Sequence, residues 1–230
     1  MSALASLARP FLDRHPRARV IALGCPETES SLDLEPFGVP VTFVDAVRDD
    51  GRVARYLAAN RARFGGPVAL PGWVLADLYL MPAAVTVLED EAGEVIAAYY
   101  AAPTLEVGCV VGVSLFSMRE GTGAATAAKA LGLGILRACV ARGVTQWRSR
   151  ALGVHARFGD MVVEGPAPAV HGLAGDSFRY RTRLGATGRG VAESMPVAEA
   201  MARVAAGERL VLAAPGGDGE RVWVRAERAP

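Results

Sequence analysis

The sequence predicts an α+β fold in which a mixed, mostly antiparallel sheet is flanked by helices. Two apolar runs at 83–89 and 95–101 flank a short acidic turn with one glycine, a pattern typical of a β-hairpin. The almost entirely apolar run at 107–116 predicts a strand that is buried on both faces. Residues 123–141 are rich in alanine and glycine and predict a helix that lies close to the sheet.

Weaker patterns predict the remaining elements. A helix is expected to begin at the caps Asp49 and Asp50 and to end near Phe64, and Arg142 and Gly143 are expected to close the helix after the apolar strand. The other predicted strands lie at 17–23, 40–47, 144–148, 161–164 and 178–184, the other helices at 71–80, 150–158 and 196–206, and a last hairpin at 209–213 and 221–225.

Composition and charge restrict the partners that we expect. The chain has 230 residues, of which 51% are apolar, enough for one large domain with terminal additions. The net charge is +1 and no basic tract occurs, so we expect no nucleic-acid partner. The longest apolar run is too short to span a bilayer, and the N-terminal residues lack the continuous apolar stretch of a signal peptide. We therefore expect a cytoplasmic protein without a membrane partner.

The three cysteines, Cys25, Cys109 and Cys139, are widely spaced and form no metal-ligand pattern. We therefore expect no metal. Cys109 in a strand and Cys139 on a helix are expected to be small buried hydrophobic residues. This use of cysteine suits a reducing cytoplasm.

The chemistry is expected at Gly121-Thr122-Gly123, between the apolar strand and the following helix. Glycine lets backbone amides approach a bulky anion, and the first turn of a helix adds free N–H groups and a partial positive charge. A phosphate group can bind at such a place without a lysine. The P-loop and dinucleotide fingerprints both require residues that are missing here, and glycine in such turns also serves packing alone.

The order of the elements and two motifs resemble the GNAT superfamily of acyltransferases. The family loop [QR]-x-x-G-x-[GA] is similar to residues 118–123, although Met118 stands where Gln or Arg is usual. A shift by one residue would use Arg119, Thr122 and Ala124 instead. Residues 151–159 are similar to the short family helix A-x-x-[LV]-[YH]-x-x-x-G. The resemblance covers about 40–185, which leaves 1–39 as an N-terminal extension and 186–230 as a C-terminal helix plus hairpin extension.

The resemblance implies acetyl-CoA or another acyl-CoA as co-substrate. Backbone amides near Val113 and Leu115 would hold the pantetheine and the thioester carbonyl. His155 occupies the position of the family's proton-donating tyrosine, with packing beneath the sheet as the alternative. Glu106 is the candidate base, one residue away from the family position, with a solvated strand start as the alternative. The loop residues expected to hold the pyrophosphate are Arg119, Glu120, Gly121, Thr122, Gly123 and Ala124.

These residues imply an N-acyltransferase that moves an acetyl or longer acyl group to an amine of a small molecule or peptide by direct attack. One alternative is acyl transfer to or from an acyl carrier protein, with decarboxylation as a possible step. Another is an inactive module that binds acyl-CoA or a partner protein. Trp73, Trp147 and His171 are expected either to shape the acceptor pocket or to pack against other side chains. The terminal extensions are a candidate interface for a homodimer.

Overall fold

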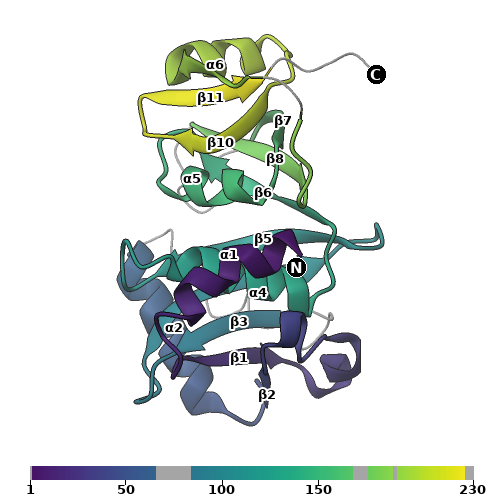
Figure 1. Cartoon of the computed structure of the whole chain (residues 1–230), viewed down its shortest axis with the longest axis vertical. Helices are drawn as coiled ribbons and strands as arrows, with labels where there is room; N and C mark the ends of the chain where they lie inside the picture. The colour runs from purple at the N-terminus through teal and green to yellow at the C-terminus, as the bar shows by residue number, and fades with distance from the viewer. Residues whose placement is uncertain (1, 66–83, 168–175, 189–190, 226–230) are drawn as a thin grey trace. The chain divides into compact units, whose positions relative to one another are not determined.

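The computed structural model describes residues 2–65, 84–167, 176–188 and 191–225. It forms two compact units, Met1–Cys139 and Val140–Pro230 (Figure 1). The boundaries drawn at 39/40 and 185/186 from the sequence fall inside these units. The helix predicted at 71–80, Trp73 and His171 lie outside the described residues.

The first unit contains a mixed sheet in the order β2-β1-β3-β4-β5. Only β1 and β2 run parallel, and the other neighbours are antiparallel. The strands are β1 (Arg19–Gly24), β2 (Thr42–Asp45), β3 (Ala84–Glu89), β4 (Val95–Pro103) and β5 (Cys109–Ser117). The helices are α1 (Ala3–Leu12), α2 (Asp50–Phe64) and α4 (Ala124–Ile135), with short 3₁₀ helices η1 (Pro26–Ser31) and η2 (Pro36–Gly38). The predicted α+β class and the hairpin of β3 and β4 are confirmed.

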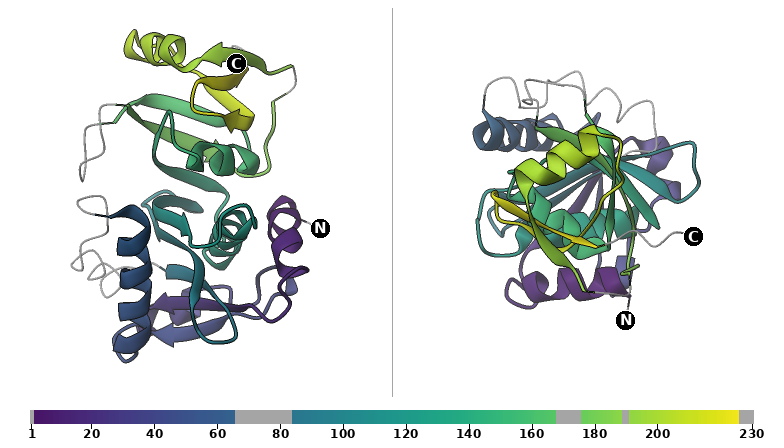
Figure 2. Two further views of the ribbon diagram at one scale, coloured as in Figure 1. Left: turned by 90° about the vertical axis from the view of Figure 1, so that its left-hand side faces the viewer. Right: turned by 90° about the horizontal axis from the view of Figure 1, so that it is seen from above.

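The two faces of this sheet are covered by different helices (Figure 2). Helix α2 packs on one face, where Tyr56 is buried against Val85, Tyr100 and Phe116. Helix α4 lies on the opposite face, and α1 packs against α4. The predicted limits of α2 are confirmed, because Asp49 caps its first turn.

The predicted N-terminal extension supplies part of the sheet. Strand β1 lies between β2 and β3, and Ile21 is in register with both Thr42 and Val87. All of β1 except its first residue is buried. These pairings join residues that are far apart in the sequence, so the local pattern predicted the strand but not its neighbours.

Helix α4 lies close to the sheet, as the small residues predicted. A Cβ built on Gly132 would lie 2.7 Å from Cδ1 of Tyr99 and 2.8 Å from Oγ1 of Thr86. The backbone of α4 therefore lies closer to the sheet at Gly132 than it could if this residue had a side chain.

The predicted end of this helix at residue 141 is wrong. Arg137 adopts a left-handed conformation with φ 50°, and its N–H bonds to Gly134 O at 2.9 Å. The N–H of Ala138 bonds to Leu133 O at 2.8 Å, so the two bonds form a Schellman motif that ends the helix. The sequence gives no glycine at this position to mark the stop.

Two further predictions are wrong, and the first of them fails because the helix ends early. Cys139 lies beyond the helix and is exposed, and its N–H bonds to Gly108 O at 2.8 Å. Cys109 is buried in β5 as predicted. The expectation that β5 is buried on both faces is also wrong, because Val111 and Val113 are 38% and 42% exposed. An apolar run does not reveal how much of each face is covered.

The second unit contains a sheet in the order β6-β8-β7-β10-β11-β9. Its neighbouring strands are antiparallel, and Val211 of β10 is in register with Val162 of β7, so the predicted C-terminal hairpin continues this sheet. The strands are β6 (Val140–Gln146), β7 (Met161–Pro166), β8 (Ser177–Arg183), β9 (Glu193–Pro196), β10 (Val211–Gly217) and β11 (Arg221–Arg225). The helices are α5 (Ala151–His155), the 3₁₀ helix η5 (Ala156–Phe158) and α6 (Val197–Ala205).

Most elements of the second unit agree with the sequence patterns. Strand β6 begins four residues before the predicted strand at 144–148, and β9 was not predicted. Trp147 is buried and its ring lies 4.2 Å from that of Phe178, which is the packing role considered for it. In the part of the chain that the structure describes, no helix combines the length and apolar character needed to cross a membrane.

Candidate functional site

The glycine loop between β5 and α4 has the conformation that an anion cradle needs. Gly121 has φ 72° and Gly123 has φ 82°, both in the left-handed region that favours glycine. Gly123 caps α4, and the first helical bond runs from the N–H of Ala127 to Gly123 O at 3.0 Å. The amides that precede Ala127 therefore lie outside the helical ladder. A Cβ on Gly121 would meet nothing within 4 Å, so the space beside it is open.

Hydrogen bonds within the loop fix this shape. The Ser117 hydroxyl donates to Arg119 O at 2.9 Å and accepts from the Arg119 N–H at 3.1 Å. The Thr122 hydroxyl donates to the same carbonyl at 2.8 Å. The loop is thus organised by side chains that bond to its own backbone, before any ligand is bound.

The two charged side chains of the loop bind to neighbouring segments. Arg119 contacts Asp90 at 2.6 Å, and Glu120 contacts Arg63 at 2.6 Å. The Arg119 guanidinium and the backbone N–H groups of the turn after β3 hold the pKa of Asp90 below its usual range, and the backbone bonds contribute most. Because both charged side chains are paired with neighbouring segments, the loop would contribute mainly its backbone N–H groups to an anion site.

Strand β5 has a bulge at Val113, one of the residues predicted to hold the thioester. Tyr100 is in register with Ser114 while Ala101 is in register with Gly112, so Val113 has no partner on β4. A bulge leaves the backbone groups of the extra residue outside the ladder of that strand pair. Leu115, the second predicted residue, is in register with Tyr99.

A buried polar contact lies next to this bulge, and the sequence reasoning missed it. The side-chain amide of Asn60 donates to the Ser114 hydroxyl at 3.1 Å, and both residues are buried. Burial raises the pKa of Tyr56, one turn earlier in α2, above its usual range. Two signals were available: Ser114 is the one hydroxyl in the run 107–116, and Asn60 follows Val53 by seven residues on the apolar helix face.

Glu106 lies on the exposed turn between β4 and β5. Its N–H bonds to the Thr104 hydroxyl at 3.1 Å, and its carbonyl accepts from the N–H of Cys109 at 3.0 Å. Cys109 lies about 13 Å from Val113 at the usual strand rise, and Glu106 lies beyond Cys109. A base must come within hydrogen-bonding reach of its proton, directly or through one water.

His155 belongs to the second unit, whereas the loop and β5 belong to the first. It is the last residue of α5 and only 6% exposed, and its Nδ1 lies 3.3 Å from the hydroxyl of Tyr180. Burial raises the pKa of Tyr180 above its usual range, so the phenol keeps its proton at neutral pH. When this phenol donates to Nδ1, the proton of the neutral imidazole lies on Nε2.

The backbone makes room for this pair. Gly143 of β6 is in register with Tyr180 of β8, and a Cβ on Gly143 would lie 2.9 Å from the phenol oxygen. A side chain at this position would displace the hydroxyl that contacts His155. In the described ranges, no group of three or more His, Cys, Asp or Glu side chains is arranged to hold a metal ion.

The sequence matches no family model and no curated protein. Among solved structures, nourseothricin acetyltransferase is 14% identical over 44% of this chain and 65% of its own, less than two thirds, with a TM-score of 0.37. A Desulfovibrio desulfuricans protein assigned to the GNAT family is 18% identical over 60% of this chain and 95% of its own, with a TM-score of 0.44. N-acetylglutamate synthase from Neisseria gonorrhoeae, solved with coenzyme A and N-acetyl-glutamate, is 14% identical over 66% of this chain and 39% of its own, with a TM-score of 0.35.

Proposed function

We propose that this chain is a GNAT-type N-acyltransferase that uses an acyl-CoA as donor and an amine of a small molecule or peptide as acceptor. The observation that carries the proposal is the left-handed turn of Gly121 and Gly123 at the start of α4, with open space beside Gly121. Backbone amides and the helix N-terminus would bind the pyrophosphate there. The resemblance of residues 118–123 and 151–159 to the family motifs supports the same ligand.

The bulge on β5 supports a place for the thioester. Attack by the amine places negative charge on the carbonyl oxygen, and a fixed backbone donor stabilises that charge. Val113 is suited to this role because its backbone groups lie outside the β4 ladder. The pantetheine arm would then run along β5 from the loop toward this residue.

His155 is proposed to act as the general acid. The amine nitrogen forms a bond to the thioester carbon, the carbon–sulfur bond breaks, and the thiolate accepts a proton from Nε2 of His155. The protonated ring, an imidazolium, gives a proton near neutral pH, and the Tyr180 hydroxyl would then accept from the N–H at Nδ1 and hold the ring, so that Nε2 gives up the proton. Glu106 takes no part, because it lies too far along the strand from Val113, and water accepts the proton of the amine.

The first test is stabilisation by donor. Acetyl-CoA, malonyl-CoA and a long-chain acyl-CoA are each added to the protein, and the melting temperature is measured together with a mass spectrum of the mixture. Ligand that binds the folded state raises the melting temperature. We expect Gly123→Trp to abolish the shift because the indole fills the anion site.

Gly207→Trp is the matched control. Gly207 also has a positive φ, 90°, and open space around its Cβ position, but it lies beyond α6 in the second unit. This variant should keep the shift. If no acyl-CoA stabilises the unaltered protein, the proposed function is wrong. Retention of a malonyl donor with loss of CO₂ would favour decarboxylation over simple transfer.

A further inference from the structure

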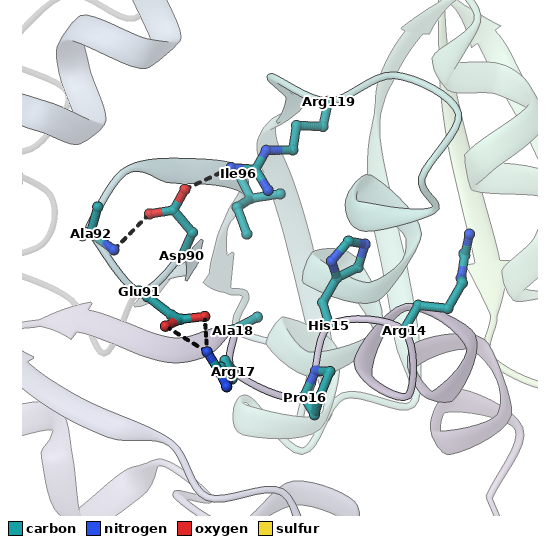
Figure 3. A pocket seen from close by; sticks show the side chains of 10 residues that line it. All are labelled: Arg14, His15, Pro16, Arg17, Ala18, Asp90, Glu91, Ala92, Ile96 and Arg119. Carbon is teal, nitrogen blue, oxygen red and sulfur yellow. Dashed lines mark hydrogen bonds and ion pairs between the residues drawn. The ribbon is translucent and has the colours of Figure 1, made fainter.

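A cavity of about 480 Å³ lies within the first unit, beside the glycine loop (Figure 3). Its walls come from the residues after α1, the turn between β3 and β4 with the start of β4, and the loop after β5. Cavities of several hundred Å³ are typical of sites for small molecules. None of the residues predicted from the sequence, apart from Arg119, lines it.

The cavity has more positive than negative side chains. Arg119 is paired with Asp90 at 2.6 Å, and Arg17 is paired with Glu91 at 3.2 Å. Arg14 instead donates from Nε to Pro10 O and from Nη2 to Thr122 O, each at 2.7 Å. Within the described ranges Arg14 contacts no carboxylate, so its charge remains to attract an anion.

Arg14 connects the cavity to the loop. Its Nη2 donates to the carbonyl in the middle of Gly121-Thr122-Gly123 and lies 3.5 Å from the Cβ position of Gly123. The bond to Pro10 O keeps the side chain in this direction, and α1 packs on α4. A diphosphate bound on the loop amides would therefore leave the loop beside this guanidinium.

Part of the cavity lining suits a flat ring. Pro16, Ala18 and Ile96 contribute apolar surface to the lining, and His15 adds a planar ring that packs on Phe11 with centroids 4.6 Å apart. Apolar and planar surfaces accept a heterocycle, while arginines bind phosphate. The combination fits a phosphorylated nucleoside better than an acyl chain or an amine.

We propose that this cavity takes the phosphorylated adenosine end of the acyl-CoA, with Arg14 contacting the diphosphate where it leaves the loop. The N-terminal segment that carries Arg14 would thus be part of the donor site. This inference rests on the proposed function. It assigns Arg14 a binding role that the sequence did not indicate.

Isothermal titration of two donors tests the assignment. Acetyl-CoA contains the phosphorylated adenosine and the diphosphate, whereas acetyl-4′-phosphopantetheine lacks the phosphorylated adenosine and the second phosphate of the diphosphate. Arg14→Ala should lower the affinity for acetyl-CoA about ten-fold or more, as expected for a lost charge-assisted contact. The affinity for acetyl-4′-phosphopantetheine should remain almost unchanged. Arg14→Lys should restore part of the loss.

Two further variants complete the experiment. Ala18→Phe fills the cavity without removing a charge and should also weaken acetyl-CoA selectively. Arg9→Ala removes an exposed arginine of α1 that does not line the cavity, and should change neither affinity. Normal acetyl-CoA affinity in both Arg14→Ala and Ala18→Phe would overturn the assignment. Equal affinity of the wild-type protein for the two donors would also overturn the assignment, but it would leave the proposed function intact. If the wild-type protein bound neither donor, the proposed function itself would be refuted.

Discussion

The side-chain amide of Asn60 donates a hydrogen bond of 3.1 Å to the hydroxyl of Ser114, the residue that follows the bulged Val113. The bond connects α2 to the middle of β5, and both partners are buried. Loss of one partner removes a hydrogen bond between two buried polar groups, which costs about 1–3 kcal/mol. The geometry of the proposed thioester site therefore depends on Asn60, a side chain of helix α2.

Asn60→Ala is expected to lower the free energy of unfolding by about 1–3 kcal/mol and Ser114→Ala by a similar amount. The double variant should lose less than the sum, because both changes remove the same bond. Urea unfolding of the four proteins gives the coupling energy. Strict additivity would show that this hydrogen bond contributes nothing to stability.

His155→Phe should lower kcat at least about 100-fold while acyl-CoA still stabilises the fold, because loss of general acid catalysis typically costs that much. Tyr180→Phe should retain more activity and move the pH profile of kcat, because the His155 ring loses a hydrogen bond at Nδ1. Turnover is followed by release of the CoA thiol. Unchanged kcat in His155→Phe would remove the residue from the mechanism.

Gly132→Ala should destabilise the protein by about 1–3 kcal/mol, because the added methyl group would overlap Tyr99 and Thr86. Gly51→Ala in α2 is the matched control. Its Cβ would meet its nearest atoms at 3.8 Å, so the change should stabilise by up to about 1 kcal/mol through helix propensity. Thermal unfolding of both variants provides the comparison. Equal effects would contradict the close approach of α4 to the sheet.

Lys129, the only lysine of the chain, is buried in α4, and burial lowers its pKa to about 7. Between pH 7 and about 10 the unfolded chain holds a proton on this amine that the folded protein has released, so stability rises with pH. The gain is at most about 1.4 kcal/mol per pH unit, and it disappears below pH 7, where both states are protonated.

Lys129→Met removes this proton linkage. Urea unfolding at pH 7 and pH 9 should therefore show that wild type gains about 2 kcal/mol relative to the variant as the pH rises. A difference that is the same at both pH values would mean that Lys129 remains charged in the fold.

The local pattern of residues determined most elements of this protein. Asp49 and Gly65 marked the ends of α2, and the small residues of α4 predicted its close approach to the sheet. Gly121 and Gly123 marked a turn between a strand and a helix, and both adopt positive φ there. Caps, periodicity and glycine act over a few residues, so they can be identified in the sequence.

Only the tertiary structure decided the partners of these elements. The sequence could not show that β1 lies between β2 and β3, that Val113 is a bulge, or that Asn60 contacts Ser114. Nor could it place Arg14 beside Thr122, 108 positions later in the chain. Such contacts depend on how distant segments pack, and packing energy has no local signature. The sequence determined the glycine loop, and the fold decided which distant side chains surround it.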